Sequence, residues 1–209
     1  MTAALATALA CYPRLSLWPG RPNPIWFLEA VIFLSATVLW GFVFAWHTQY
    51  TNRPVFTFKV ESRPLAAATL VGLCAAIVLH VFLDPSLRLK IPEDYPADLE
   101  QWLAMTLFSL ALSQLFLVFA PFAWLVRLFK NRWVATVLTV LFGVVVLVMK
   151  ARSSPTPIPP ALLAALLVVR IVLGFLTVLF YLRGGVMLVW WCGFLVEARH
   201  LLNLGLARH

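Results

Sequence analysis

Two charged residues lie deep within the most apolar part of the chain, where they could take part in chemistry. Arg170 precedes Gly184 by 14 residues, and Glu197 follows it by 13. In an antiparallel helical hairpin that turns at 183–185, the two residues would lie at nearly the same depth. An arginine at the centre of a membrane costs roughly 2.5–3.5 kcal/mol on insertion scales, so it faces a partner or a cavity. We therefore predict an Arg170–Glu197 ion pair, which either locks two helices together or lines a ligand cavity.

A second, uncharged polar pair, Ser113 and Gln114, lies in the middle of another apolar run. A glutamine in this position more often forms a hydrogen bond across helices than it performs chemistry. A serine can donate to its own helix backbone. Across the basic turn 127–132, Gln114 is level with Val145 and Val146, so it faces an apolar partner helix or turns toward the last two spans. We treat both residues as buried polar groups that could line a cavity.

His80 is the candidate ligand for a cofactor. It follows Ala76 by four residues, and a small residue one turn before a histidine inside the membrane can admit a flat tetrapyrrole whose metal the imidazole binds. The alternative is a hydrogen-bonded histidine at the membrane interface. We predict no cofactor, and the tetrapyrrole remains the one cofactor for which the sequence offers a ligand.

Other catalytic patterns are missing from the sequence. It contains no G-x-S-x-G, no H-E-x-x-H, no phosphate-binding loop and no pair of acids within one span. The three cysteines, Cys11, Cys74 and Cys192, form no C-x-x-C motif, which argues against a disulfide framework or a zinc site. We therefore expect neither catalytic residues nor a metal site.

The composition is that of an integral membrane protein. The 209 residues are 63% hydrophobic and 11% charged, whereas soluble domains have about 45–50% apolar and about 25% charged residues. The net charge is +8, but the basic residues are scattered through short connections, which favours contact with lipid headgroups. Nucleic acid is therefore not an expected partner.

The apolar pattern predicts an all-α membrane bundle of six transmembrane helices. Each apolar run has about 20 residues, the length that a hydrocarbon core of about 30 Å requires. Helices satisfy their own backbone groups in lipid. The expected spans are 24–47, 65–83, a kinked span from Leu99 past Pro121, 133–149, 161–182 and 186–204.

We expect two parts along the chain. Residues 1–24 begin apolar, but they lack a charged start and contain Pro13, so a cleaved signal is not expected. We predict a short interfacial helix with a Pro- and Gly-rich lead-in there, and a single membrane domain over 25–209.

The order of features in the second half is similar to a known family. The relevant segments are SQLFLVF at 113–119, RLFKNRW at 127–133, ATVLTVLFG at 135–143 and GFLTVLFYLRGG at 174–185. In spacing and apolar texture they resemble the CPBP family, the CAAX-protease and bacteriocin-processing (Abi) group of membrane proteins. Its members carry E-E-x-x-x-R, a basic turn, A-x-x-x-S-x-L-L-F-G-x-x-H, Y-L-R-T-G and a final H-x-x-x-N or D. The resemblance implies a CPBP-like core over 99–204.

The functional positions depart from the family pattern. The glutamate pair of the family falls on Ser113 and Gln114, and its arginine falls on Val118. The histidine of F-G-x-x-H falls on Val146, and the final histidine falls near Phe194. The family is thought to activate a water with a glutamate and two histidines, so the resemblance implies a pseudoprotease without that activity.

We therefore expect a non-catalytic, multi-pass accessory or scaffold subunit, not an enzyme. Its partners would be the lipid bilayer and other membrane proteins of a complex, in the bacterial inner (cytoplasmic) membrane. Two alternatives remain open. One is an intramembrane protease-like enzyme with a remodelled site near Gln114, Arg170 and Glu197, and the other is a tetrapyrrole-binding subunit that uses His80.

Overall fold

The computed structural model describes residues 1–18, 20–50, 54–57, 60–153 and 156–206, so the last three residues of the expected domain 25–209 lie outside the described residues. The helices are α-helical except for the π-helical turns η1, η3 and η4 and the 3₁₀ turn η2. In chain order the elements are α1 (Thr2–Ser16), α2 (Ile25–Tyr50), α3 (Ser62–Val78), η1 (Leu79–Leu83), α4 (Asp84–Lys90), η2 (Pro92–Asp94), α5 (Leu99–Phe108), η3 (Ser109–Ser113), η4 (Leu115–Phe119), α6 (Ala120–Phe129), α7 (Arg132–Ser153) and α8 (Pro160–Leu206).

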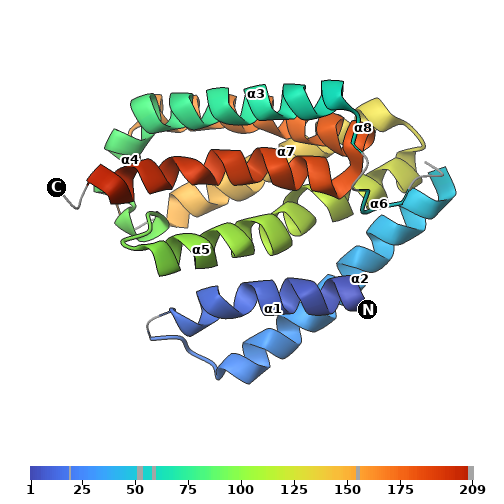
Figure 1. The fold of residues 1–209 in the computed structure, drawn as a ribbon, viewed down its shortest axis with the longest axis horizontal. Coiled ribbons are helices and arrows are strands. Elements are labelled where there is room, and N and C mark those ends of the chain that lie inside the picture. The colour runs from blue at the N-terminus through green and yellow to red at the C-terminus, as the bar shows by residue number, and fades with distance from the viewer. Residues whose placement is uncertain (19, 51–53, 58–59, 154–155, 207–209) are drawn as a thin grey trace.

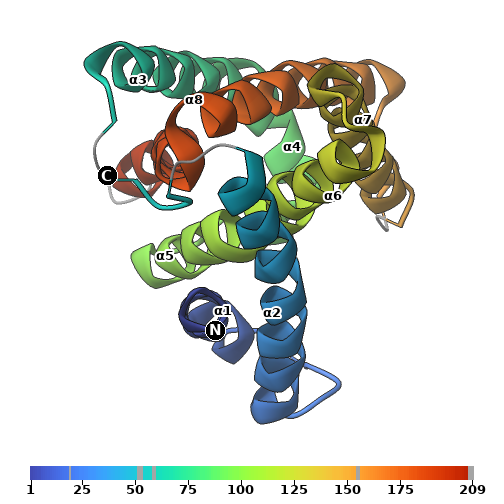
Figure 2. The same cartoon turned by 90° about the vertical axis from the view of Figure 1, so that its right-hand side faces the viewer.

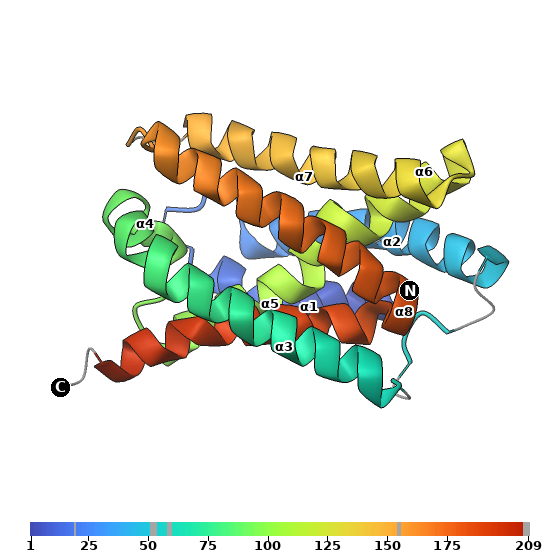
Figure 3. The same cartoon turned by 90° about the horizontal axis from the view of Figure 1, so that it is seen from above.

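The prediction of an all-α membrane bundle is confirmed. Within the described ranges, five helical stretches are long and apolar enough to cross a membrane, and the last of them, Pro160–Leu202, has 43 residues. This stretch consists of two helices joined at Gly185, whose backbone is not helical. The two halves run in opposite directions from that turn (Figure 3), so the described chain supplies the six expected spans.

The helices form three layers around a central kinked helix (Figures 1 and 2). The continuous helix from α5 to α6 lies in the middle. On one side it contacts the pair α1 and α2, and on the other side it contacts α7 and α8, with α3 packed on α8. The polar ends of α4, α5, α7 and α8 meet at one end of the bundle (Figure 1).

Two prolines lie far from the start of their spans, Pro85 and Pro121, and in each case a π-helical turn precedes the proline by the same offset. The turn η1 ends two residues before Pro85, and η4 ends two residues before Pro121. Proline lacks the N–H that would bond to the preceding turn and clashes with its carbonyl, and a widened π turn relieves both problems. The prediction that the third span continues past Pro121 is therefore confirmed. The prediction that the second span ends at Leu83 is wrong, because the helix continues to Lys90.

The core at the opposite end of the bundle is aromatic. Tyr181 on α8 is 1% exposed and packs against Trp46, Phe119 and Phe122. Its hydroxyl lies 3.1 Å from Nδ1 of His47, which is also buried. Burial of such large rings is the main source of packing energy available between these helices.

The hairpin turn in α8 depends on a single glycine. Gly185 has φ 68° and ψ −162°, a combination that side chains rarely adopt. A Cβ atom at this position would lie 2.9 Å from the carbonyl oxygen of Val55. The N–H of Val186 donates to the same carbonyl at 3.3 Å, so the connection before α3 packs directly against the turn.

The predicted N-terminal helix is present as α1, and it lies alongside the spans. It packs on α2 and α5, and it crosses α2 at an angle (Figures 1 and 2). The indole N–H of Trp40 donates to the hydroxyl of Thr7 at 3.0 Å, and Cys11 is fully buried. The helix is therefore packed into the bundle, while its contact with lipid headgroups stays a prediction.

Replacing Gly185 by alanine should destabilise the hairpin. Gly20 also has a positive φ, but nothing lies within 4 Å of its Cβ position, so Gly20→Ala is the matched control. We expect Gly185→Ala to lower the free energy of unfolding by roughly 2–4 kcal/mol and Gly20→Ala by only about 1 kcal/mol. Circular dichroism during unfolding in detergent micelles measures both, and equal losses would contradict the role assigned to the Val55 contact.

Candidate functional site

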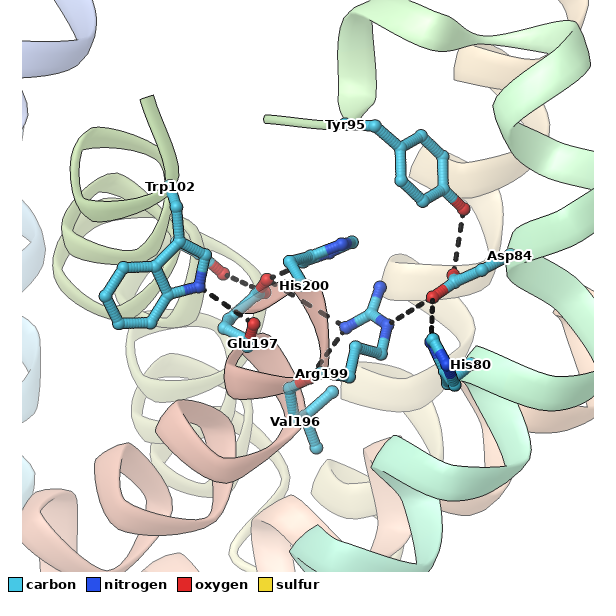
Figure 4. Close-up of polar contacts among 9 residues, drawn as sticks. His80, Asp84, Tyr95, Trp102, Val196, Glu197, Arg199 and His200 are labelled. Carbon is cyan, nitrogen blue, oxygen red and sulfur yellow. Dashed lines mark hydrogen bonds and ion pairs between the residues drawn. The ribbon is translucent and has the colours of Figure 1, made fainter. Parts of the chain in front are cut away.

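A cluster of polar side chains joins three helices at one end of the bundle (Figure 4). Its centre is Asp84, the first residue of α4, whose side chain is 3% exposed. The hydroxyl of Tyr95 donates to Oδ1 of Asp84 at 2.9 Å, and Nε of Arg199 donates to Oδ2 at 3.2 Å. Both carboxylate oxygens therefore have a hydrogen-bond partner, which is the condition for keeping a buried charge.

The second acid of the cluster is Glu197 on α8. Its Oε1 accepts a hydrogen bond from the hydroxyl of Ser109 at 3.1 Å, and its Oε2 lies 3.9 Å from the guanidinium of Arg199. Its backbone carbonyl accepts a hydrogen bond from the indole N–H of Trp102 at 3.0 Å. Arg199 thus lies between two acids (Figure 4), and the cluster ties α4, α5 and the end of α8 together.

The two histidines of the cluster are too far from the acids for hydrogen bonds. Nδ1 of His80 is 3.9 Å from Asp84, and Nε2 of His200 is 3.7 Å from Glu197. A hydrogen bond requires about 2.7–3.2 Å. The ring of His200 instead packs edge-on against Tyr95, with 5.3 Å between the centroids.

This geometry differs from that of a catalytic triad. In a catalytic triad a histidine stands between the nucleophile and the acid, whereas Ser109 donates directly to Glu197. Across the described residues, no group of three or more His, Cys, Asp and Glu side chains could hold a metal ion. Chemically, the cluster behaves as a buried ion-pair network.

The electrostatics of the cluster affect Tyr95, which lies in the connection between the second and third spans. Burial, the hydrogen bond to Asp84 and the charge of Asp84 raise the pKa of Tyr95 above its ordinary value of 10.0. The charges of Arg199 and Arg88 oppose this shift, and Arg88 lies 5.1 Å from the centre of the ring. Tyr95 is therefore held in its neutral, hydrogen-donating form.

The predicted Arg170–Glu197 ion pair is wrong. Glu197 is held by Ser109 and the Arg199–His200 end of α8, and none of its contacts comes from Arg170. The two halves of α8 diverge from the turn, and α3 lies over them (Figure 3).

The physical reason for this divergence is a row of leucines between the two halves of α8. The row consists of three buried side chains of the second span, Leu79, Leu83 and Leu87. Leu166 and Val169 of the first half of α8 and Val196 of its second half pack against these leucines. Equal depth along the hairpin therefore does not bring Arg170 and Glu197 into contact.

Arg170 lies against α7 instead. Its guanidinium covers Gly143, where an added Cβ would be 2.5 Å from Nη2. No hydrogen bond or ion pair joins Arg170 to any residue in the described part of the chain. Its side chain is only partly buried.

The structure also places the uncharged pair, Ser113 and Gln114, and the candidate cofactor ligand His80. Ser113 lines a hollow on the outer face together with Val146. Gln114 turns toward the last span, where its Nε2 is 3.8 Å from the Cβ position of Gly193. His80 joins the polar cluster, and Ala76, which would have to be open for a flat ligand, is only 8% exposed.

Comparison with known proteins gives no match. No family model, curated protein or solved structure matches this chain. The relation to the CPBP family therefore remains a hypothesis that rests on the sequence alone.

Several residues of the cluster were not among the sequence candidates. The apolar pattern ends the second span at Leu83, which leaves Asp84 in the following connection, and it gives Arg199 no role. A signal was nevertheless present in the spacing. His80 and Asp84 are four residues apart, and Glu197 and His200 are three apart, so each pair lies on one face of a helix. Both pairs are also near the end of a span.

Removing Arg199 should be much worse than removing the whole ion pair. Arg199→Met leaves the charge of Asp84 buried without its cation, which typically costs about 3–5 kcal/mol. The double variant Asp84→Asn/Arg199→Met should recover most of that loss. Unfolding in detergent micelles measures all variants, and a double variant whose loss equals the sum of the single losses would show that the pair is not coupled.

Tyr95→Phe should change the stability at alkaline pH. In the unfolded chain Tyr95 ionises near pH 10, whereas in the folded protein its pKa is raised. The neutral hydroxyl therefore stabilises the fold below pH 10, and this contribution is lost as the pH rises further. We expect the melting temperature of the variant to be lower at pH 8 and to fall less between pH 9 and 11. Parallel curves for the two proteins would contradict this assignment.

Proposed function

We propose that this chain is a non-catalytic, multi-pass accessory or scaffold subunit of a membrane-protein complex in the bacterial inner membrane. The observation that carries the proposal is the state of the two acids of the polar cluster, the buried Asp84 and the partly buried Glu197. Asp84 is bound by Tyr95 and Arg199, and Glu197 is bound by Ser109. A general base must be free to accept a proton from a water or a nucleophile within hydrogen-bond reach. Tyr95 and Arg199 occupy both oxygens of Asp84, and the bond from Ser109 to Glu197 joins the third span to the last one, so we assign both carboxylates a structural role.

The outer face between α2 and α7 supports a role in assembly. It carries two adjoining hollows of about 600 and 700 Å³, both of which include Leu39 and Phe116 in their lining. Their walls are almost entirely apolar. Within a membrane, helix association depends on close packing of such surfaces, and we propose that a transmembrane helix of a partner protein packs into these hollows.

We also propose that the chain is a degenerate member of the CPBP family. The resemblance places a catalytic glutamate at Ser113 and a histidine at Val146, and these two residues line the same hollow. That both positions line one hollow supports the proposal. The side chains there are a hydroxyl and a valine, so the hydrolytic groups of the family are replaced at that place.

The assembly role can be tested by filling the shared part of the hollows. Leu39→Trp should reduce the amount of any stoichiometric membrane partner that is recovered with the chain after extraction in mild detergent. Leu70→Trp is the control, because Leu70 lies on α3 and is 65% exposed. Native mass spectrometry measures the stoichiometry. A chain that is monomeric in its native membrane, or a complex that Leu39→Trp leaves unchanged, would contradict this role.

The absence of catalysis is tested separately. The purified chain should not hydrolyse prenylated peptides or leader peptides, because the two acids of the polar cluster already accept hydrogen bonds from Tyr95, Arg199 and Ser109. Mass spectrometry of the peptides after incubation measures this. Cleavage by the wild type that is abolished in Glu197→Gln would overturn the non-catalytic assignment and would favour a remodelled protease.

A further inference from the structure

A cluster of three positive charges lies at the turn between α6 and α7. The six residues 127–132 include Arg127, Lys130 and Arg132, and all three side chains are exposed. None of them forms an ion pair with any residue in the part of the chain that the structure describes. The turn therefore presents three cations whose partner has to come from outside the described chain.

The backbone that carries these charges has a defined shape. Lys130 ends α6 in the left-handed conformation, with φ 53°. Asn131 then caps α7, because its side-chain oxygen accepts hydrogen bonds from the N–H groups of Trp133 and Val134. Only two residues thus join the two helices, which keeps the three cations close to one another.

This end of the bundle lies opposite the polar cluster (Figures 1 and 3). The structure describes all eight acidic residues, and of these only Glu61, which precedes α3, lies at the end of the turn. At the opposite end the cations have acidic partners, since Lys150 pairs with Asp94 and Arg199 pairs with Asp84. A single acid cannot balance the three cations of the turn.

An apolar hollow runs from this turn into the membrane. Its volume is about 600 Å³, and it lies between α2, α6 and α7. Leu128 and Phe129 line it beside the turn, and Phe116 lines it 13 residues, or about 20 Å, deeper along the same span. Trp124 in its lining and Trp133 beside the turn are 51% and 78% exposed. Exposed tryptophans of this kind mark the level of the lipid headgroups.

We propose that the turn and this hollow form a binding site for an anionic phospholipid. The phosphate of the headgroup pairs with Arg127, Lys130 and Arg132, and an acyl chain lies in the hollow. Clusters of basic residues next to a membrane span attract anionic lipids. Guanidinium groups also match the geometry of a phosphate. The elongated, apolar hollow that leads inward from the cations suits a hydrocarbon chain attached to such a headgroup.

The lipid site goes beyond the proposed role in assembly. The second hollow, of about 700 Å³, adjoins the first at Leu39 and Phe116, away from the turn. A partner helix that crosses the bundle there leaves the end beside the turn open to lipid. Because lipid binding is measured on the isolated chain, either proposal can fail without the other.

Competition between two lipids tests the site. The purified full chain in an uncharged detergent is mixed with equal amounts of phosphatidylglycerol and phosphatidylcholine that have the same acyl chains, and native mass spectrometry counts the bound lipids. We expect the wild type to bind phosphatidylglycerol at least about tenfold more tightly, because each cation favours the anionic headgroup. The variant Arg127→Gln/Lys130→Gln/Arg132→Gln should lose most of this preference.

A matched triple variant separates a local site from the net charge. Arg21→Gln/Lys90→Gln/Arg152→Gln removes three charges away from the turn, at positions that form no ion pair in the described ranges, and it should keep the preference. Both triple variants should melt at the wild-type temperature. Equal binding of the two lipids by the wild type, a preference that persists in the turn variant, or an equal loss in both triple variants would overturn the site. A turn variant that melts well below the wild type would also do so, because the cations would then serve the fold.

Leu141→Trp tests the role of the hollow. Leu141 belongs to the lining and is 50% exposed, so a tryptophan there fills the hollow without entering the core. The variant should bind less phosphatidylglycerol, and Leu70→Trp on α3 should bind the wild-type amount. Wild-type binding by Leu141→Trp would overturn the assignment of the acyl chain to the hollow. A turn variant that loses a co-purified protein but keeps its phosphatidylglycerol would assign the cations to a protein contact and overturn the lipid site.

Discussion

The buried pair between Asp84 and Arg199 is the interaction on which the polar end of the bundle depends. The pair joins the end of the second span to the end of the last one. Nε of Arg199 lies 3.2 Å from Oδ2 of Asp84. Because the side chain of Asp84 is almost completely buried, neither charge could stay there alone. Tyr95 and Glu197 complete the network, so the connection before α5 and α5 itself are fixed by the same contacts.

The position of Asp84 depends on how the second span accommodates Pro85. A proline two residues after η1 would be expected to end a helix, yet the π turn lets the chain continue as α4. Without that extra turn, Asp84 would lie in a connection outside the bundle. The same device carries the third span past Pro121, which places the buried side chains Phe119 and Phe122 around Tyr181. The two π turns thus position Asp84 in the polar cluster and Phe119 and Phe122 in the aromatic core. A helix interrupted at the proline could not position them in this way.

The row of leucines on the second span determines which groups the charged residues of α8 contact. By separating the two halves of α8, it gives Glu197 to the polar cluster and leaves Arg170 against Gly143. Hydrophobic packing therefore decides the electrostatics of the interior. An arginine without an acidic partner among the described residues is costly in a membrane.

The sequence by itself determined the membrane class, the all-α architecture, the six spans and the turn at 183–185. These properties depend on local composition, on run length and on the backbone freedom of glycine, all of which can be read along the chain. It also identified Arg170, Glu197 and His80 as polar groups worth attention. Only the tertiary structure decided their partners. Depth along a helix fixes one coordinate, whereas contact also requires the rotation and separation of helices, and these were set by Leu79, Leu83 and Leu87 from a third span.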